Sequence, residues 1–182
     1  MKFLKTEVAD VWVIEPRRFG DHRGYFMESF RADLFKEHIG AVDFVQDNES
    51  LSTRGVLRGL HYQKGAASQA KLVRVSQGAV LDVAVDLRRS SPTFLKHVAV
   101  ELSAENGRQL FIPRGFAHGF LVLSDRAQFQ YKVDNVYCPE AEASIRFDDS
   151  DIGINWPIAA SEMVLSDKDL RGTALKDADF FD

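Results

Sequence analysis

Short runs of β-forming residues, separated by turn residues, follow one another along most of this chain and constrain its fold more than any other feature. Ten such runs are present, at 11–16, 24–30, 43–51, 56–63, 71–78, 79–87, 95–102, 108–113, 119–124 and 127–137. Strands at this spacing are typical of all-β sandwiches and barrels. The chain also has 14 phenylalanines, a residue type enriched in strands. We therefore expect a mainly β fold.

Only one early segment, 31–40, has the pattern of a helix. Ala32, Phe35 and Ile39 recur at helical spacing, and Gly40 is a typical stop signal. No repeat, low-complexity tract or linker interrupts the 182 residues, and this length suits one core. We expect a single domain that spans residues 1–182.

The composition argues against several classes of partner and location. The net charge of −4 leaves no basic footprint for nucleic acid. No run of 18 apolar residues could span a membrane, and residues 1–12 lack the apolar region of a signal peptide. The single cysteine, Cys138, cannot form an internal disulfide. These features favour a cytoplasmic protein that binds neither nucleic acid nor membranes.

The run 79–87 alternates between apolar and mostly polar positions. One face carries Leu81, Val83, Val85 and Leu87, and the other carries Asp82, Ala84 and Asp86. The two aspartates can face either water or a polar cavity. For a strand taken alone, the solvated face is the favoured interpretation.

The stretch "RGLHYQ", residues 58–63, raises the question of whether His61 belongs to a core or to a reaction. In a regular strand Gly59, His61 and Gln63 share one face, and Arg58 lies on the other. Arg58 and His61 could share a site if the strand bulges near Gly59, or they could act at different depths. If the runs 56–63 and 71–78 are neighbours, His61 could also meet Lys71.

Two kinds of chemistry compete for these residues. A metal site in a β-barrel typically uses His-x-His on one strand, but position 63 is Gln63, and the five histidines form no ligand-spaced pair. We therefore expect no catalytic metal. Acid–base chemistry remains, with His61 as the natural base and either Asp167 or Asp169 to orient it. Tyr131 and Lys71 could supply a proton and a positive charge, but ordinary structural roles also fit both.

Six separated stretches carry a resemblance to a known family. They are "FGDHRGYFMESF", "FVQDNESLSTRGVLRGLHYQ", "AKLVRVSQGAVLDVAVDLRRSSPTF", "LFIPRGFAHGF", "YKVDNVYCPEAEASIRFDD" and "LSDKD". In this order they resemble the dTDP-4-dehydrorhamnose 3,5-epimerase family of cupin-like barrels, from about residue 3 to residue 169. The resemblance implies a cupin-like jelly-roll barrel of antiparallel strands with a few short helices, and a homodimer.

The resemblance also implies an activity. The expected reaction is epimerisation of dTDP-4-dehydro-6-deoxy-glucose at C3 and C5 to the L-rhamnose configuration, with no metal and no cofactor. A mono-epimerase that acts on one carbon is the alternative. By resemblance His61 is the base, Asp169 its partner and Tyr131 the acid, while Lys71 stabilises the enolate. The glycan that receives the product, such as lipopolysaccharide, is left open.

Substrate-binding residues follow from the same resemblance. The expected binding set is Arg23, Glu28, Gln46, Asn48, Arg58, His118, Tyr137, Glu142 and Lys168. Guanidinium groups of Arg23 and Arg58 suit a diphosphate, and Tyr137 is expected to stack on thymine. The chain departs from the family's sequence pattern in "ASIRFDD", where Phe147 is expected to replace the tryptophan of a Gly-Ile-x-Trp-like turn. We expect this replacement to affect packing near the end of the site that binds the nucleotide.

Overall fold

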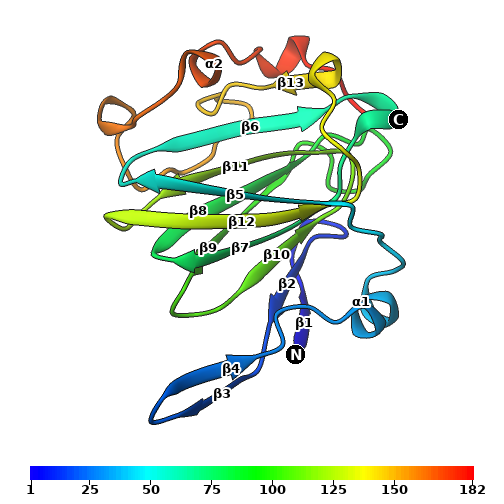
Figure 1. The fold of residues 1–182 in the computed structure, drawn as a ribbon. Coiled ribbons are helices and arrows are strands. Elements are labelled where there is room, and N and C mark those ends of the chain that lie inside the picture. The colour runs from blue at the N-terminus through cyan, green and yellow to red at the C-terminus, as the bar shows by residue number, and fades with distance from the viewer.

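Two antiparallel β-sheets face each other in the computed structural model, which describes residues 1–182, and they enclose a barrel (Figure 1). In spatial order the six-stranded sheet contains β1 (Lys2–Lys5), β2 (Trp12–Glu15), β10 (Gln109–Ile112), β7 (Lys71–Gln77), β12 (Arg126–Val133) and β5 (Gln46–Thr53). The five-stranded sheet contains β13 (Glu142–Ser144), β6 (Leu57–Gln63), β11 (Phe116–Val122), β8 (Ala79–Asp86) and β9 (His97–Ser103). The predicted mainly β barrel is confirmed.

The remaining elements are short. A separate hairpin pairs β3 (Arg18–Asp21) with β4 (Gly24–Met27), and the two α-helices are α1 (Ala32–His38) and α2 (Asp167–Leu170). Single 3₁₀ turns lie at Gly65–Ala67, Pro139–Ala141, Ala160–Glu162 and Leu175–Asp177. The helix predicted at 31–40 is confirmed as α1. No helix has the length and hydropathy that a membrane crossing requires.

The main hydrophobic core fills part of the space between the sheets. It includes residues from β7, β8, β11 and β12, and the rings of Phe120 and Phe129 stack there with centroids 4.1 Å apart. On β8, Ala84 belongs to this inner core, so Asp82 and Asp86 on the same face also point inward. Both aspartates are 0% exposed, so the solvated-face interpretation is wrong. Val83 on the opposite face packs under the C-terminal segments.

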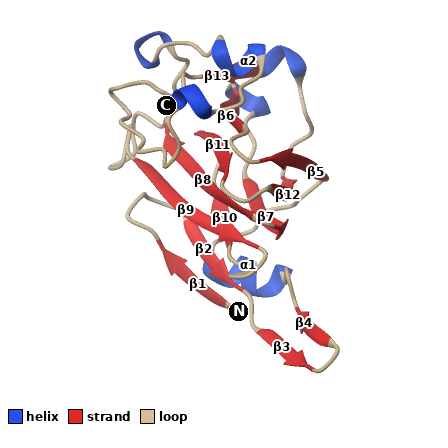
Figure 2. Cartoon of the chain, turned by 90° about the vertical axis from the view of Figure 1, so that its left-hand side faces the viewer, coloured by secondary structure: helices blue, strands red, loops and turns tan.

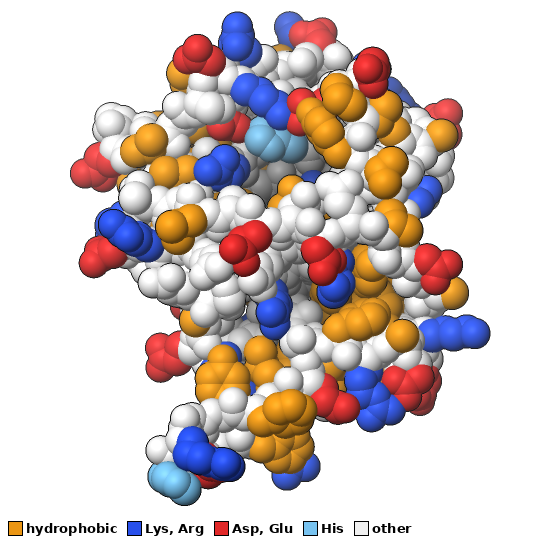
Figure 3. Space-filling view, viewed as in Figure 1, with side chains coloured by type: hydrophobic (Ala, Val, Ile, Leu, Met, Phe, Trp, Pro, Cys, Tyr) orange, Lys and Arg blue, Asp and Glu red, His pale blue; other side chains and the backbone are white.

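The β3–β4 hairpin, here called the arm, projects away from the barrel (Figure 2). Phe19, Tyr25 and Phe26 on the arm are 51%, 57% and 68% exposed, and Figure 3 shows hydrophobic side chains gathered at the bottom of the view. At the base of the arm, the Arg18 guanidinium donates hydrogen bonds to the carbonyls of Ala104 and Glu105. The arm is therefore anchored at its base while its aromatic side chains remain uncovered.

Several strand boundaries differ from those predicted. Strands β1, β3 and β13 were not predicted, because they are short and contain none of the β-branched residues that mark β2 and β10. Strand β11 starts at Phe116 instead of 119 and includes His118. All seven of its residues are buried, so it also lacks alternation. The strand predicted at 127–137 ends at Val133.

The expectation that Phe147 replaces the tryptophan of a Gly-Ile-x-Trp-like turn is wrong. The chain has its own Gly-Ile-x-Trp segment at 153–156, further along than expected. The Trp156 indole Nε1–H donates a 2.9 Å hydrogen bond to the Phe147 carbonyl, and Phe147 packs with Leu57 and Leu121. Phe147 and Trp156 are therefore neighbours in one small core, and neither lines the polar cavity described next.

Candidate active site

A cavity of about 370 Å³ is lined by side chains from both sheets, among them residues of β5 and β6. These two strands face each other in Figure 1. Five of its sixteen lining residues are hydrophobic, so it suits a polar ligand. The lining consists of Asn48, Glu49, Ser50, Arg58, His61, Tyr62, Gln63, Gln69, Lys71, His118, Phe120, Phe129, Tyr131, Tyr137, Glu142 and Lys168. Nine of the predicted site residues are among them.

A second cavity, of about 360 Å³, includes residues of the six-stranded sheet and of the segment after the arm. Its charged groups already have polar partners. Lys132 contacts Asp47 at 2.9 Å, and Gln130 donates to Glu49 while it accepts from Arg74. It contains no histidine. The first cavity is therefore the candidate for proton transfer.

His61 on β6 is held by the buried carboxylate of Asp169. Asp169 Oδ1 accepts hydrogen bonds from His61 Nε2 at 2.7 Å and from Gly59 N at 3.1 Å, and Oδ2 accepts from Ser166 in the capping box of α2. Burial acts to raise the pKa of Asp169, but these hydrogen bonds outweigh it and hold the pKa well below its ordinary value. Because an ionised carboxylate only accepts, Nε2 carries the hydrogen, and Nδ1 keeps the lone pair of a base.

Strand β6 is irregular next to His61. The register between β6 and β11 shifts between the His61–His118 pair and the Arg58–Phe120 pair. Gly59 has φ +145°, and a Cβ atom there would lie 2.5 Å from the Cα of Gly119. Glycine is thus required where the two strands approach. Arg58 and His61 both line the cavity, and of the two possibilities left open by the sequence the register shift shows the irregularity near Gly59.

Lys71 comes from the opposite sheet. Its strand, β7, lies between β10 and β12, so Lys71 and His61 face one cavity from different sheets and are not neighbours within one. Burial lowers the pKa of Lys71 to about 8, against the opposing effect of the carboxylates of Asp82 and Glu142. The group is therefore still mostly charged at physiological pH but titrates close to it, and a pKa shifted in this way is common among residues of functional sites.

Asp82 and His118 form a second imidazole–carboxylate pair inside the barrel. His118 Nε2 lies 3.0 Å from Asp82 Oδ2, and both side chains are buried. Burial lowers the pKa of His118, while Asp82 opposes that shift. Asp82 also acts on Lys71, whose pKa it raises. The carboxylate of Asp82 therefore favours the charged forms of both Lys71 and His118, against the effect of burial.

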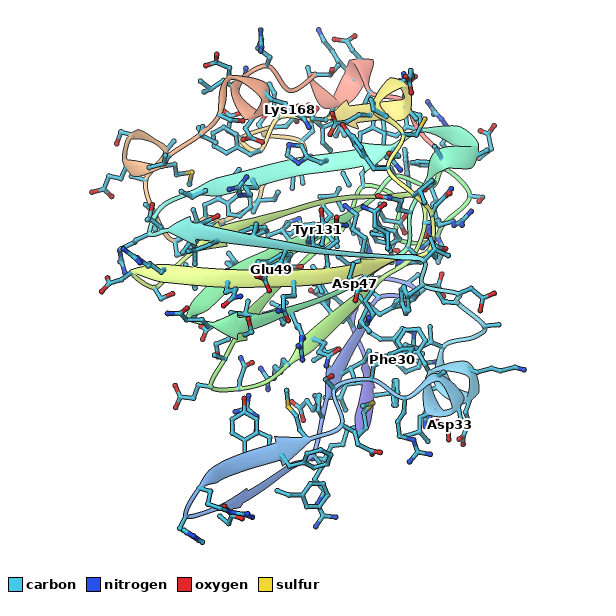
Figure 4. All side chains as sticks on the ribbon, in the orientation of Figure 1. Phe30, Asp33, Asp47, Glu49, Tyr131 and Lys168 are labelled. Carbon is cyan, nitrogen blue, oxygen red and sulfur yellow. The ribbon has the colours of Figure 1, made fainter.

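Tyr131 faces the cavity from β12, in the sheet opposite the one that carries His61. In Figure 4 it lies below Lys168, which comes from α2 at the top of the view. Burial raises the pKa of Tyr131, with Glu142 adding to the rise and Arg58 opposing it. The phenol therefore keeps its proton at neutral pH and can donate it.

The rim of the cavity joins three segments through Glu142. Its carboxylate accepts a 3.0 Å hydrogen bond from the hydroxyl of Tyr137 and pairs with the ammonium of Lys168. Burial acts to raise the pKa of Glu142, but these two partners outweigh it and lower the pKa. Gln46 accepts from the backbone N–H of Tyr137 at 3.2 Å and donates to Asn48 at 2.9 Å. The rim is thus a connected polar network.

Four of the predicted site residues are absent from the lining of this cavity. Asp169 and Gln46 adjoin it through hydrogen bonds to His61 and Asn48, whereas Arg23 and Glu28 belong to the arm and the segment after it. Arg23 is at the tip of the arm, where its exposed guanidinium pairs with Asp21 at 2.6 Å. Glu28 follows the arm and lies 3.9 Å from Arg31. The sequence analysis also did not assign six polar groups in or behind the lining, namely Glu49, Ser50, Tyr62, Gln63, Gln69 and Asp82. Alternation along 46–53 was the signal available for Ser50, since every second residue there is at least partly buried.

An enzyme that moves protons within one polar substrate needs a base, an acid and a fixed charge, and the side chains of His61, Tyr131 and Lys71 in this cavity have the chemistry for these roles. The barrel and cavity together define an acid–base isomerase. The family model of dTDP-4-dehydrorhamnose 3,5-epimerase matches residues 5–177, and the chain belongs to that family.

Three relatives illustrate the similarity. The chain is 57% identical over 182 residues to a dTDP-4-dehydrorhamnose 3,5-epimerase of Shigella flexneri, covering 100% of this chain and 99% of that protein. A Legionella pneumophila dTDP-6-deoxy-D-glucose-3,5-epimerase, solved with dTDP-4-keto-L-rhamnose, superposes with a TM-score of 0.93 at 49% identity, covering 98% and 94% of the two chains. A 3'-monoepimerase of Streptomyces bikiniensis, solved with dTDP-quinovose, gives a TM-score of 0.88 at 36% identity over 95% and 87%. These neighbours confirm the cupin-like jelly-roll fold.

Proposed function

We propose that residues 1–182 act as one domain that epimerises dTDP-4-dehydro-6-deoxy-D-glucose at C3 and C5 to dTDP-4-dehydro-L-rhamnose, a step in dTDP-L-rhamnose biosynthesis. The observation that carries this proposal is the hydrogen-bonded pair of His61 and Asp169 in a polar cavity that Tyr131 faces from the opposite sheet. Membership of the family supports it. The reaction needs neither a metal nor a redox cofactor, because it only exchanges protons on carbon.

The proposed first step is removal of a proton beside the C4 ketone. Nδ1 of His61 takes the proton from C3 or C5, and the ionised carboxylate of Asp169 stabilises the imidazolium that forms. The electron pair of the broken C–H bond moves to the C4 oxygen and gives an enolate. The ammonium of Lys71 stabilises that oxygen, as a preorganised charge does in an oxyanion site.

Inversion requires a proton from the other face of the sugar. Tyr131 is proposed to donate its phenolic proton to the enolate carbon while the C4 ketone re-forms. A raised pKa suits this role, because it keeps the phenol protonated until the enolate is present. The position of Tyr131 on the sheet opposite His61 supports the assignment.

Binding of the nucleotide and diphosphate is proposed for the remaining polar groups. The planar guanidinium of Arg58 suits phosphate oxygens, and the half-exposed ring of Tyr137 suits stacking on thymine. The proposed contacts with sugar and nucleotide come from Gln46, Asn48, His118, Glu142 and Lys168, five residues with polar atoms in or beside the cavity.

A homodimer is proposed as the working unit. Uncovered aromatic side chains on the arm, together with the free outer edge of β1, favour a second copy as their partner. In such a pair Arg23 and Glu28 would serve the cavity of the other protomer, which explains why both lie outside their own. The proposed location is the cytoplasm, which the free cysteine Cys138 favours.

Deuterium exchange tests the proposal directly. The protein is incubated with dTDP-4-dehydro-6-deoxyglucose in D₂O, and NMR follows C3 and C5. Exchange with inversion at both carbons is expected, and His61→Ala should abolish the exchange while dTDP still binds. Absence of exchange at both carbons would overturn the proposal. Exchange at one carbon only would instead favour a mono-epimerase, the activity named for the Streptomyces bikiniensis relative.

A further inference from the structure

The segment 134–138, which follows β12 and carries Tyr137, is held in place largely by side chains. Beyond Val133 it belongs to no strand. Three glutamines supply hydrogen bonds to its backbone. These are Gln69 Nε2 to the Asn135 carbonyl at 2.6 Å, Tyr137 N to Gln46 Oε1 at 3.2 Å, and Cys138 N to Gln63 Oε1 at 2.6 Å. The position of Tyr137 therefore depends on amide groups that come from the barrel.

Gln63 is the most strongly held of the three. Its side chain is 5% exposed, and both ends of the amide are used. Oε1 accepts from Cys138 N, while Nε2 donates to the Ala67 carbonyl at 2.8 Å and lies 3.5 Å from the Val136 carbonyl. One buried side chain thus contacts the residues immediately before and after Tyr137, and leaving these backbone groups unpaired would be costly.

The ring of Tyr137 has little else to hold it. It is 51% exposed, and its one side-chain hydrogen bond runs to Glu142. A stacking residue is useful only if its plane is set before the ligand arrives, because ordering it later costs entropy. The backbone on either side of Tyr137 must therefore supply that order.

We propose that Gln63 is a positioning residue for Tyr137, and that it sets the plane on which the thymine of a dTDP-linked substrate stacks. The inference rests on the proposed binding of thymine by Tyr137. Gln63 also stands at the position where a His-x-His strand would carry its second imidazole. In this barrel the residue at that position holds the backbone of the proposed thymine-binding segment instead of a metal ion.

A double-mutant cycle tests the inference, with dTDP as the probe and calorimetric Kd as the readout. The four proteins are the wild type, Gln63→Met, Tyr137→Ala and the double variant. Tyr137→Ala should raise Kd by about 5- to 150-fold, the usual range for loss of one stacking partner. Gln63→Met should raise Kd by about 5- to 20-fold, and the double variant should match Tyr137→Ala within about 2-fold, because the two residues act through one contact.

Steady-state kinetics provide a second readout that a purely structural role would not produce. Gln63→Met should raise KM while kcat stays within about 2-fold, since Gln63 makes no hydrogen bond to His61, Tyr131 or Asp169. If Gln63→Met does not fold, Gln63→Asn replaces it in the cycle. That variant keeps a neutral amide, but one methylene fewer withdraws it from Cys138 N and the Ala67 carbonyl, so Kd should again rise and the effect should again be lost in the Tyr137→Ala background.

The outcomes separate this inference from the proposed function. Independent, multiplicative effects of Gln63→Met and Tyr137→Ala on Kd would overturn the positioning role, as would an unchanged Kd in the Gln63 variant. In both cases a wild type that binds dTDP and epimerises the sugar leaves the proposed function intact. A wild type that does not bind dTDP removes the proposed function, and the inference with it.

Discussion

Asp169 and His61 lie 2.7 Å apart, Oδ1 to Nε2, although 108 residues separate them in the chain. The same carboxylate closes the capping box of α2 through Ser166 and accepts the backbone N–H of Gly59. The start of a short helix therefore fixes the group that orients the proposed base. A side chain held from three directions cannot turn away when the imidazole changes charge.

Asp169→Asn should lower kcat with little change in the affinity for dTDP. An amide is neutral, so it cannot balance the imidazolium that forms when His61 takes a proton. We expect a fall of about 10²- to 10⁴-fold, as for other groups that orient a catalytic histidine. Rates and calorimetric Kd measure the two effects. Asp167→Asn, an exposed position in the same first turn, is the matched control, and an equal fall in that variant would contradict the role of Asp169.

The alkaline limb of the pH–rate profile should reflect Lys71. The proposed role needs the charged ammonium, and burial lowers the pKa of Lys71 from 10.5 to about 8. The group is charged below that pH and neutral above it. The value of kcat/KM, which reports the free enzyme, should therefore fall above about pH 8 by up to tenfold per pH unit. Lys71→Arg should move this limb to higher pH, because guanidinium stays charged. If the alkaline limb of the Lys71→Arg variant stays at the same pH, the titrating group is not Lys71.

Tyr131→Phe should separate proton removal from inversion. The ring remains to pack beside Phe129, whose centroid lies 6.1 Å away, so the wall of the cavity should keep its shape. His61 can still take a proton and return one to the same face. Exchange with D₂O should therefore continue, while NMR shows inverted product formed about 10²- to 10⁴-fold more slowly. Equal suppression of exchange and inversion would argue against a role limited to proton donation.

Phe26→Ser should weaken the proposed homodimer. The Phe26 side chain is 68% exposed on the arm, and covering it would contribute about 1.5–3 kcal/mol to association. Sedimentation equilibrium should show a shift toward monomer, with weaker binding of dTDP as Arg23 and Glu28 leave the other cavity. Val164→Ser, which removes a comparably exposed apolar side chain outside the arm, is the control. A wild type that is monomeric at all concentrations would remove the dimer from the proposal.

Local patterns were enough to predict α1 and most central strands, because their signal lies in consecutive residues. The period-2 pattern of 79–87 placed Asp82 and Asp86 on one face correctly, but it could not say which face is inside. That depends on a second sheet far along the chain. The opposite faces of Arg58 and His61 in a regular strand left two possibilities, an irregularity near Gly59 or action at different depths, and the register shift between β6 and β11 shows the irregularity.

The choice between Asp167 and Asp169 shows where local patterns stop. Both are acidic residues in the first turn of α2, and one of them is buried against His61 while the other is exposed. Helical spacing separates their directions but does not reveal which direction meets β6. Only the resemblance to a family favoured Asp169. Gln63 was noticed as a missing imidazole, while its contacts with 134–138 required the fold.

The polar wall of the barrel has an evolutionary consequence. Lys71, Asp82 and His118 keep charges and imidazoles where apolar side chains would pack more stably. Selection for heat resistance alone would therefore favour replacements such as Lys71→Met, which would remove the charge that is proposed to stabilise the enolate. The thermal tolerance of this barrel is limited by its chemistry, and a more stable descendant has to find its gains elsewhere, in the sheet faces that the substrate never meets.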